Sequence, residues 1–132
     1  MDMLELKSQV RDSASEIYRI LGAGYNETVY EEAMAVEFRA RKILYEVERN
    51  TEIFYKDVKV GLHRLDFILD GKLVLELKAW ASITSSHVGQ TTAYLKTLKL
   101  HHGILVNFPY PEKDSPDFKE LVIWFKNQIK NS

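Results

Sequence analysis

The sequence predicts an α/β or α+β fold in which helices flank a mixed β-sheet. The patterns of hydrophobic residues follow the order helix, helix, several strands, helix and strand. One strand, residues 104–108, is almost purely apolar, which is typical of a strand buried on both faces. The 132 residues suit one core, and no linker or repeat divides them, so residues 1–132 are expected to form a single domain.

Two helices are expected near the start of the chain. Residues 4–21 carry apolar side chains three and four positions apart, as an amphipathic helix requires, at Val10, Ala14, Ile17 and Leu21. A second helix is expected over residues 26–41. Its N-cap is Asn26 or Thr28, and Thr28 with Glu31 would form a capping box.

The rest of the chain is expected to supply the sheet and one more helix. Residues 44–79 form a β-rich stretch that ends in two strands around Asp70 and Gly71. A long helix is expected over residues 85–100, before the apolar strand. The partial alternation over residues 118–129 favours a final strand over a helix.

Composition and charge narrow the class of protein. There are no cysteines, which excludes disulfides and thiolate metal sites. No apolar run approaches the roughly 20 residues of a membrane span, and the N-terminus lacks the form of a secretory signal. A cytoplasmic (intracellular) protein without membrane contact is therefore expected. Since the formal net charge is −1, any binding of nucleic acid must use a local basic patch, a dimer cleft or metal ions.

The two strands around Asp70 and Gly71 follow a parity rule. Odd positions are apolar on both strands, and even positions carry nearly all the charge. Because successive side chains of a strand point to opposite faces, burial requires the odd residues of both strands to share one face. A plain two-residue turn would pair Leu69 with Lys72. We therefore expect an odd-length loop, such as residues 69–71 with Gly71 in the left-handed conformation, or a bulge elsewhere in the hairpin.

In that register, Asp66, Glu76 and Lys78 project from one face of adjacent strands. Two neighbouring carboxylates repel each other unless a hard cation lies between them, and carboxylate oxygen is the ligand that Mg²⁺ and Mn²⁺ prefer. The lysine could orient an attacking water or stabilise charge on phosphorus. These are the parts of metal-assisted phosphodiester hydrolysis. The alternative, on the hairpin alone, is a solvated face with ordinary surface residues.

Asp66, followed after nine residues by Glu76-Leu77-Lys78, is similar to the D…ExK signature of the PD-(D/E)XK nuclease superfamily. Within that superfamily the chain resembles the GxxExxY family over about residues 5–108. The motifs follow in that family's order at residues 21–33 (LGAGYNETVYEEA), 54–56 (FYK), 64–66 (RLD), 75–79 (LELKA), 87–95 (HVGQTTAYL) and 103–108 (GILVNF). Leu65 stands where the signature has proline, and the tail after Pro109 matches poorly.

The resemblance implies a restriction-endonuclease-like core and a nuclease that uses Mg²⁺ or Mn²⁺. Asp66 and Glu76 would be metal ligands, and Lys78 would be the catalytic lysine. Glu27 would be an additional acidic residue near the metal. Gln90 would lie beside the site on the following helix, and we include it among the catalytic candidates. The resemblance does not supply the substrate, for which we expect DNA.

Structural roles compete with functional ones for several residues. Glu27 also suits the first turn of a helix, where the helix dipole favours acids. His87, Gln90 and Tyr94 share one helical stripe, and a structural role is favoured for His87 and Tyr94, whereas both readings stay open for Gln90. Trp80 could stack on a nucleobase or pack in the core.

Three hypotheses about function follow. The leading one is a metal-dependent deoxyribonuclease or phosphodiesterase. The second is a catalytically inactive nuclease-like fold that acts as a nucleic-acid-binding or assembly module, which the near-neutral charge allows. The third is a regulatory homodimer, in which an exposed edge strand in the tail could pair two copies. Trp124 and Phe125 are expected in the core or at such an interface.

Overall fold

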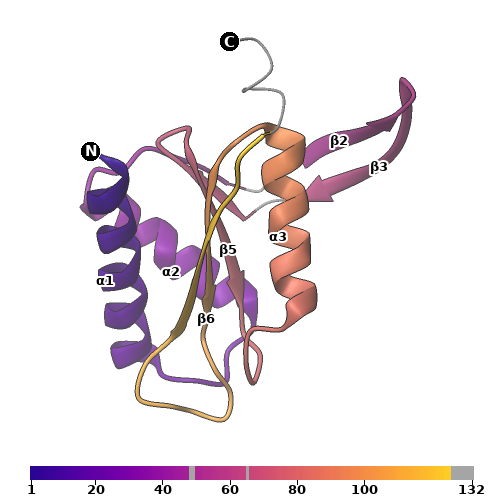
Figure 1. The fold of residues 1–132 in the computed structure, drawn as a ribbon. Helices are drawn as coiled ribbons and strands as arrows, with labels where there is room; N and C mark the ends of the chain where they lie inside the picture. Colours follow the sequence, from indigo (N-terminus) through magenta and orange to yellow (C-terminus); the bar gives the residue numbers. More distant parts are fainter. Residues whose placement is uncertain (48–49, 65, 126–132) are drawn as a thin grey trace.

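Two helices cover one face of a five-stranded sheet, and a third helix covers the other face (Figure 1). The computed structural model describes residues 1–47, 50–64 and 66–125. The sheet has the order β1 (Tyr45–Val47), β4 (Phe67–Leu69), β5 (Leu73–Lys78), β6 (His102–Asn107) and β7 (Asp117–Val122). The helices are α1 (Met3–Leu21), α2 (Glu27–Ala40) and α3 (Ser85–Leu98). β5 and β6 pair in parallel and the other neighbours pair antiparallel, so the predicted mixed sheet is confirmed.

α2 begins one residue after its predicted start. The Asn26 side chain accepts a hydrogen bond from the Val29 N–H at 3.3 Å, which makes Asn26 the N-cap. Thr28 lies inside the helix instead, so the capping box considered for Thr28 and Glu31 is wrong. The physical reason is that an N-cap must have extended backbone, and Asn26 has it, with φ −76° and ψ 168°.

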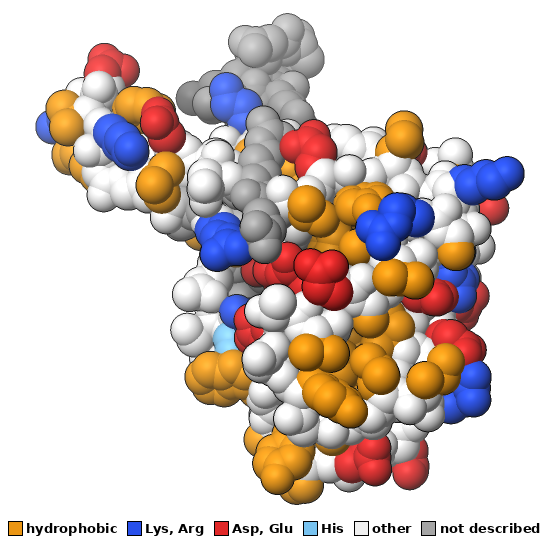
Figure 2. Space-filling model, turned by 180° about the vertical axis from the view of Figure 1, so that it is seen from behind, with side chains coloured by type: hydrophobic (Ala, Val, Ile, Leu, Met, Phe, Trp, Pro, Cys, Tyr) orange, Lys and Arg blue, Asp and Glu red, His pale blue; other side chains and the backbone are white. Residues whose placement is uncertain are grey.

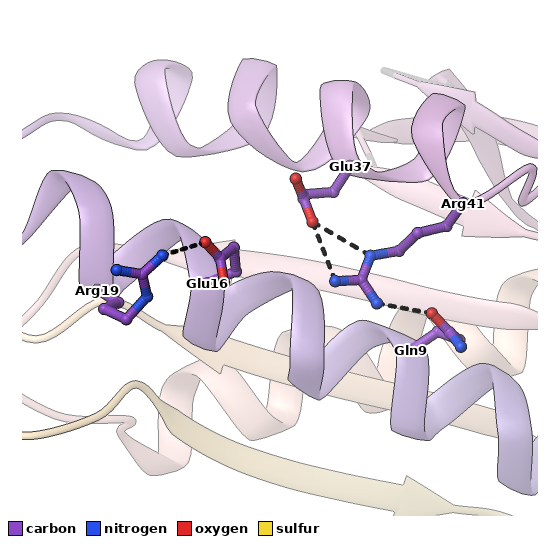
Figure 3. Close-up of polar contacts among 5 residues, drawn as sticks. All are labelled: Gln9, Glu16, Arg19, Glu37 and Arg41. Carbon is purple, nitrogen blue, oxygen red and sulfur yellow. Dashed lines mark hydrogen bonds and ion pairs between the residues drawn. The ribbon is translucent and has the colours of Figure 1, made fainter.

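Arg41, which follows the last residue of α2, ties the first two helices together (Figure 3). Its guanidinium donates to Glu37 of its own helix at 3.1 Å and to Gln9 of α1 at 2.7 Å. The Arg19–Glu16 pair in the same view lies within α1 and is exposed, so it contributes little to stability.

The β4–β5 hairpin has the register that the burial pattern predicts. Leu69 pairs with Leu73, so odd residues face odd residues and three intervening residues form the loop. The loop lies one residue further along than the expected residues 69–71. Asp70 and Gly71 both have positive φ, of 51° and 65°. The predicted left-handed glycine and odd-length loop are therefore confirmed, with the position shifted.

Both faces of this hairpin are covered. Its odd residues pack with α1 and α2 in the larger core, through Phe67, Leu69, Leu73, Leu75 and Leu77. Its even residues Ile68 and Val74 pack with Leu95 of α3 in the smaller core. Glu76, on the even side, is only 4% exposed. The alternative of a solvated even face is therefore wrong for this residue.

The described part of the tail contains a strand, as favoured from the sequence. β7 pairs antiparallel with β6 at the edge of the sheet. Residues 126–129, the rest of the predicted segment, lie outside the described residues. Trp124, just beyond β7, is 76% exposed, so a place in the core is wrong for it. A role for this residue in a dimer stays a prediction.

β2 (Asn50–Tyr55) and β3 (Val58–Arg64) form a separate two-stranded hairpin that projects from the body beside α3 (Figure 1). Its large apolar side chains are more than half exposed at Phe54, Tyr55, Val58, Val60 and Leu62. β3 ends at Arg64, so the base of the projecting hairpin lies close in the chain to the start of β4.

α1 is 19 residues long, and its buried residues, which include Lys7, alternate with exposed polar and charged ones. Among the described residues, no helix combines the length and the apolar character that a membrane crossing requires.

The left-handed turn of the β4–β5 hairpin gives a stability prediction. Gly71 has a φ of +65° and open space around it, so Gly71→Ala changes only the backbone strain. We expect a loss of about 1 kcal/mol in the free energy of unfolding, measured by urea denaturation. The matched control is Gly89→Ala in α3, which also meets nothing within 4 Å but needs no positive φ. It should stabilise by roughly 0.5–1 kcal/mol. Equal effects of the two substitutions would contradict this account of the turn.

Candidate functional site

Asp66 and Glu76 approach each other where the β4–β5 hairpin opens. Asp66 lies directly before β4 and continues the register in which Phe67 pairs with Leu75, which puts it opposite Glu76. The Asp66 N–H donates to Glu76 Oε1 at 3.2 Å, and Asp66 Oδ2 accepts from the Leu77 N–H at 2.7 Å. Each carboxylate is thus fixed by the backbone of the segment opposite it.

Lys78 is the last residue of β5 and lies two residues after Glu76, on the same side of the strand. Its ammonium group is close enough to Glu27, Asp66 and Glu76 to oppose the rise in pKa of each carboxyl. The structure therefore brings together four of the residues singled out in the sequence: two facing carboxylates, a third acid and a lysine.

α2 contributes acids from its first two turns. Glu27, the first residue of the helix, accepts a hydrogen bond from the Ala79 N–H just beyond β5. Glu31 lies one turn later, and a hydrogen bond joins its carboxyl group to that of Asp66. A bond between two carboxyl groups requires one of them to hold a proton. Figure 2 shows acidic side chains gathered below the projecting hairpin on the side of the molecule turned away in Figure 1.

Burial makes negative charge unfavourable at this cluster. Desolvation and the neighbouring charge of Asp66 raise the pKa of Glu76 to about 8. Desolvation also raises the pKa of Asp66 above its usual range, although the hydrogen bonds from Leu77 and Glu31 oppose the shift. The pKa of Glu27 is raised for the same first reason. These groups would ionise more readily with a positive charge between them.

α3 lies over the face of the sheet that carries Glu76, and three of its residues, His87, Gln90 and Tyr94, were predicted to share one helical stripe. His87 is buried and forms a capping box with Thr84: its Nδ1 accepts from the Thr84 N–H at 3.1 Å, so the structural role favoured for it is supported. Desolvation is the main cause that raises the pKa of Tyr94, and the charges of Glu76 and Asp66 add to it. Tyr94 therefore lies near the carboxylates. Gln90 is exposed. No contact within the described part of the chain joins it to the acids, and its role stays a prediction.

The donor set suits a hard cation. Within residues 1–47, 50–64 and 66–125, no three His, Asp or Glu side chains converge as a ready-made metal cage. Mg²⁺, however, is typically bound by one or two carboxylates together with waters and substrate phosphates. Asp66 and Glu76 supply that pair, and a cation between them would oppose the desolvation that raises the pKa of each. The residues present thus fit a divalent cation.

Glu31 is the member of the cluster for which the sequence indicated only a capping role, and no place at the site. Its bond to Asp66 places it in direct contact with the paired carboxylates. A signal was present, because Glu31 lies four residues after Glu27 and therefore on the same helical face. Its proximity to Asp66 could not be read from spacing, since it depends on how α2 packs against the sheet.

Comparison with known proteins identifies the family. The family model of the PD-(D/E)XK nuclease superfamily matches residues 4–121, and the chain belongs to this superfamily. Its mixed sheet between helices is accordingly a restriction-endonuclease-like fold. PD-(D/E)XK nucleases generally use divalent metals and act on nucleic acid.

A solved structure is similar to the chain in fold. The crystal structure of SSO0001 matches with a TM-score of 0.54 and 21% sequence identity, over 96% of this chain and 64% of that chain. This chain therefore spans less than two thirds of the length of that protein, and the likeness extends to the fold alone. No curated protein matches the sequence.

The raised pKa of Glu76 predicts how stability depends on pH without divalent metal. A carboxyl group with an ordinary pKa of 4.5 and a folded-state pKa of about 8 binds more protons in the folded state between those values. Its stabilising contribution is present below pH 4.5 and is lost as the pH rises toward 8. The side chain of Glu76→Gln stays neutral at both pH values. We therefore expect its free energy of unfolding, relative to that of the wild type, to be higher at pH 8 than at pH 5 by on the order of 1–3 kcal/mol.

The measurement is chemical denaturation at both pH values in the presence of a chelator. Asp12→Asn, an exposed substitution on α1, serves as the control and should follow the wild type. If Glu76→Gln and wild type change by the same amount between pH 5 and pH 8, Glu76 is not protonated in the metal-free fold.

Proposed function

We propose that this chain is a metal-dependent nuclease that hydrolyses phosphodiester bonds of nucleic acid, with DNA as the expected substrate. The observation that supports this most is the convergence of Asp66, Glu76 and Lys78 on the face of the sheet beneath α3. Within the superfamily we assign the chain to the GxxExxY family, on the motifs around Glu27 and Tyr30. We also propose that residues 1–132 act as a single domain.

The proposed roles follow from position and chemistry. Asp66 and Glu76 would hold Mg²⁺ or Mn²⁺, and Glu27 would add a third acid near the ion. A bound divalent cation supplies Lewis-acid activation and charge neutralisation for phosphodiester hydrolysis. Lys78 donates hydrogen bonds from the end of β5 to the attacking water or to a non-bridging phosphate oxygen, where negative charge builds up. Gln90 would orient the substrate from α3.

The surroundings of the acids support an ion-dependent reaction over a purely structural cluster. An isolated buried carboxylate is costly, and here two lie opposite each other, with positive charge from Lys78 and, for Asp66, also from Arg64. The pKa values of both carboxyl groups stay raised in spite of these cations. This, together with the superfamily to which the chain belongs, favours the nuclease over a non-catalytic module.

Activity measurements test this proposal directly. The protein is incubated with single-stranded and duplex DNA and RNA, with Mg²⁺, with Mn²⁺ and with a chelator. We expect cleavage only with metal, and a loss of roughly 100- to 1,000-fold in kcat for Asp66→Asn, Glu76→Gln and Lys78→Met. These substitutions keep the shape of each side chain, so thermal unfolding should show that the proteins remain folded.

Asp12→Asn provides the matched control for the acids, because it removes one exposed carboxylate from α1, across the sheet from α3. It should retain full activity. Cleavage that persists in Asp66→Asn and Glu76→Gln would refute the proposed site. Binding of nucleic acid without turnover under every metal condition would support the non-catalytic binding module instead.

A further inference from the structure

Trp80 presents its indole ring to solvent two residues beyond the end of β5. The residue is 54% exposed, although tryptophan is on average a highly buried residue type. Its place in the core, one of the two readings of the sequence, is therefore excluded. A large exposed aromatic ring at the rim of a candidate active site has a chemistry of its own, since it offers a π-face to a planar ligand.

One neighbour fixes the backbone of Trp80 and another contacts its ring. Asn107 Oδ1 accepts a hydrogen bond from the backbone N–H of Trp80 at 2.8 Å, and the Asn107 side-chain amide donates to the Trp80 carbonyl at 2.9 Å. Asn107 is fully buried and also donates to Asp117 at 3.0 Å, which fixes its own orientation. The His87 ring of α3 meets the indole at 90°, with 4.7 Å between centroids. An aromatic ring that is already positioned loses little entropy when a ligand binds.

The indole adjoins the carboxylate cluster. Ala79, the residue before Trp80, donates its N–H to Glu27. His87, which contacts the indole, also lies near Lys78. Two residues of extended chain span at most about 7 Å, so the backbone of Trp80 lies within roughly two base steps of the proposed catalytic lysine. A nucleotide bound at Trp80 would therefore neighbour the nucleotide at the carboxylates.

A cationic side chain contacts the residue that follows Trp80. Lys113 donates from its ammonium group to the Ala81 carbonyl at 3.2 Å. Residues 82–85 then line an open hollow of about 420 Å³ whose charged lining residues are Lys113, Lys119 and Asp117. Asp117 accepts a hydrogen bond from Asn107, so the two lysines are the groups there that can meet the phosphates of a strand crossing Trp80. Single-stranded nucleic acid is typically bound by aromatic rings together with cationic side chains.

We propose that Trp80 is a stacking site for an unpaired nucleobase beside the scissile phosphodiester bond. The proposal rests on the nuclease function, because it takes that bond to lie at Asp66 and Glu76. Bases inside a duplex have both faces covered by their neighbours, whereas an unpaired base has a free face to stack. The substrate class is therefore single-stranded nucleic acid, or a duplex with an unpaired end or flap at the point of cleavage.

Trp124 provides a matched control. It is 76% exposed but contacts His101, with 5.1 Å between ring centroids. His101 precedes β6 and Asn107 is the last residue of that strand, so the two tryptophans lie near opposite ends of six residues of extended chain. At about 3.3 Å per residue this separates them by roughly 20 Å.

Fluorescence reports on each indole separately, because the chain has two tryptophans. A short single-stranded oligodeoxythymidine is titrated into Trp124→Phe, in which Trp80 is the remaining tryptophan, with and without Mg²⁺. We expect saturable quenching of Trp80 emission by the stacked base, and none with a blunt duplex of the same length. In the reciprocal Trp80→Phe protein, the emission of Trp124 should not respond.

Affinity gives an independent measure. Trp80→Ala should weaken binding of the single strand roughly 5- to 150-fold, whereas Trp80→Phe should retain most of it because phenylalanine also stacks. Trp124→Ala should bind like the wild type. If Trp80→Ala fails to fold, the fluorescence titration still decides the question, since it uses the native Trp80.

Single-strand binding that leaves Trp80 emission unchanged would overturn the proposal, and so would the lack of any single-strand binding. The nuclease function fails on a different observation, namely the absence of hydrolysis of every nucleic acid with every metal. Quenching at Trp80 does not depend on hydrolysis, so the two failures are distinguishable.

Discussion

The fold holds two carboxyl groups opposite each other inside a covered strand pair. Alternation along β5 turns Glu76 to the same side as Val74, beneath α3, and the odd-length turn puts Asp66 in register with it. Each group is held by a hydrogen bond: Asp66 Oδ2 accepts from the Leu77 N–H, and Glu76 Oε1 accepts from the Asp66 N–H. Desolvation and the charge of Asp66 therefore act on Glu76 in this geometry and raise its pKa.

The elements around this pair act on its charge in different ways. From α2, Glu27 raises the pKa of Glu76 through its charge, whereas Glu31 lowers that of Asp66 through a hydrogen bond. Lys78 at the end of β5 and Arg64 at the end of β3 bring positive charge near Asp66. Asn107, at the end of β6, forms hydrogen bonds with the backbone of Trp80, just after β5. Trp80 is thereby held at the same end of the two strands. The arrangement is consistent with a site completed by an ion and by the phosphates of a substrate.

Much of this could be predicted from the sequence, and the reasons differ by feature. The parity of Leu69 and Leu73 fixed the register, because a one-residue slip would have turned the apolar face outward. The apolar run of β6 correctly indicated burial on both faces. The contact between Glu31 and Asp66 was not predictable, since it depends on the packing of a helix against strands distant in the chain. The exposure of Trp80 and of Trp124 was not predictable either, because the residue type alone does not determine whether a tryptophan is buried. For Gln90 the helix was predicted correctly, but the side chain is exposed while the buried residues of α3 are His87, Thr91 and Leu95.

The central claim is that Asp66 and Glu76 jointly bind one divalent cation. Crystals of the protein soaked in Mn²⁺ would test it through the anomalous scattering of the metal. The account predicts one strong peak within about 2.0–2.3 Å of a carboxylate oxygen from each residue, lost in crystals of Asp66→Asn. Manganese bound elsewhere, with no peak between these two carboxylates, would contradict it.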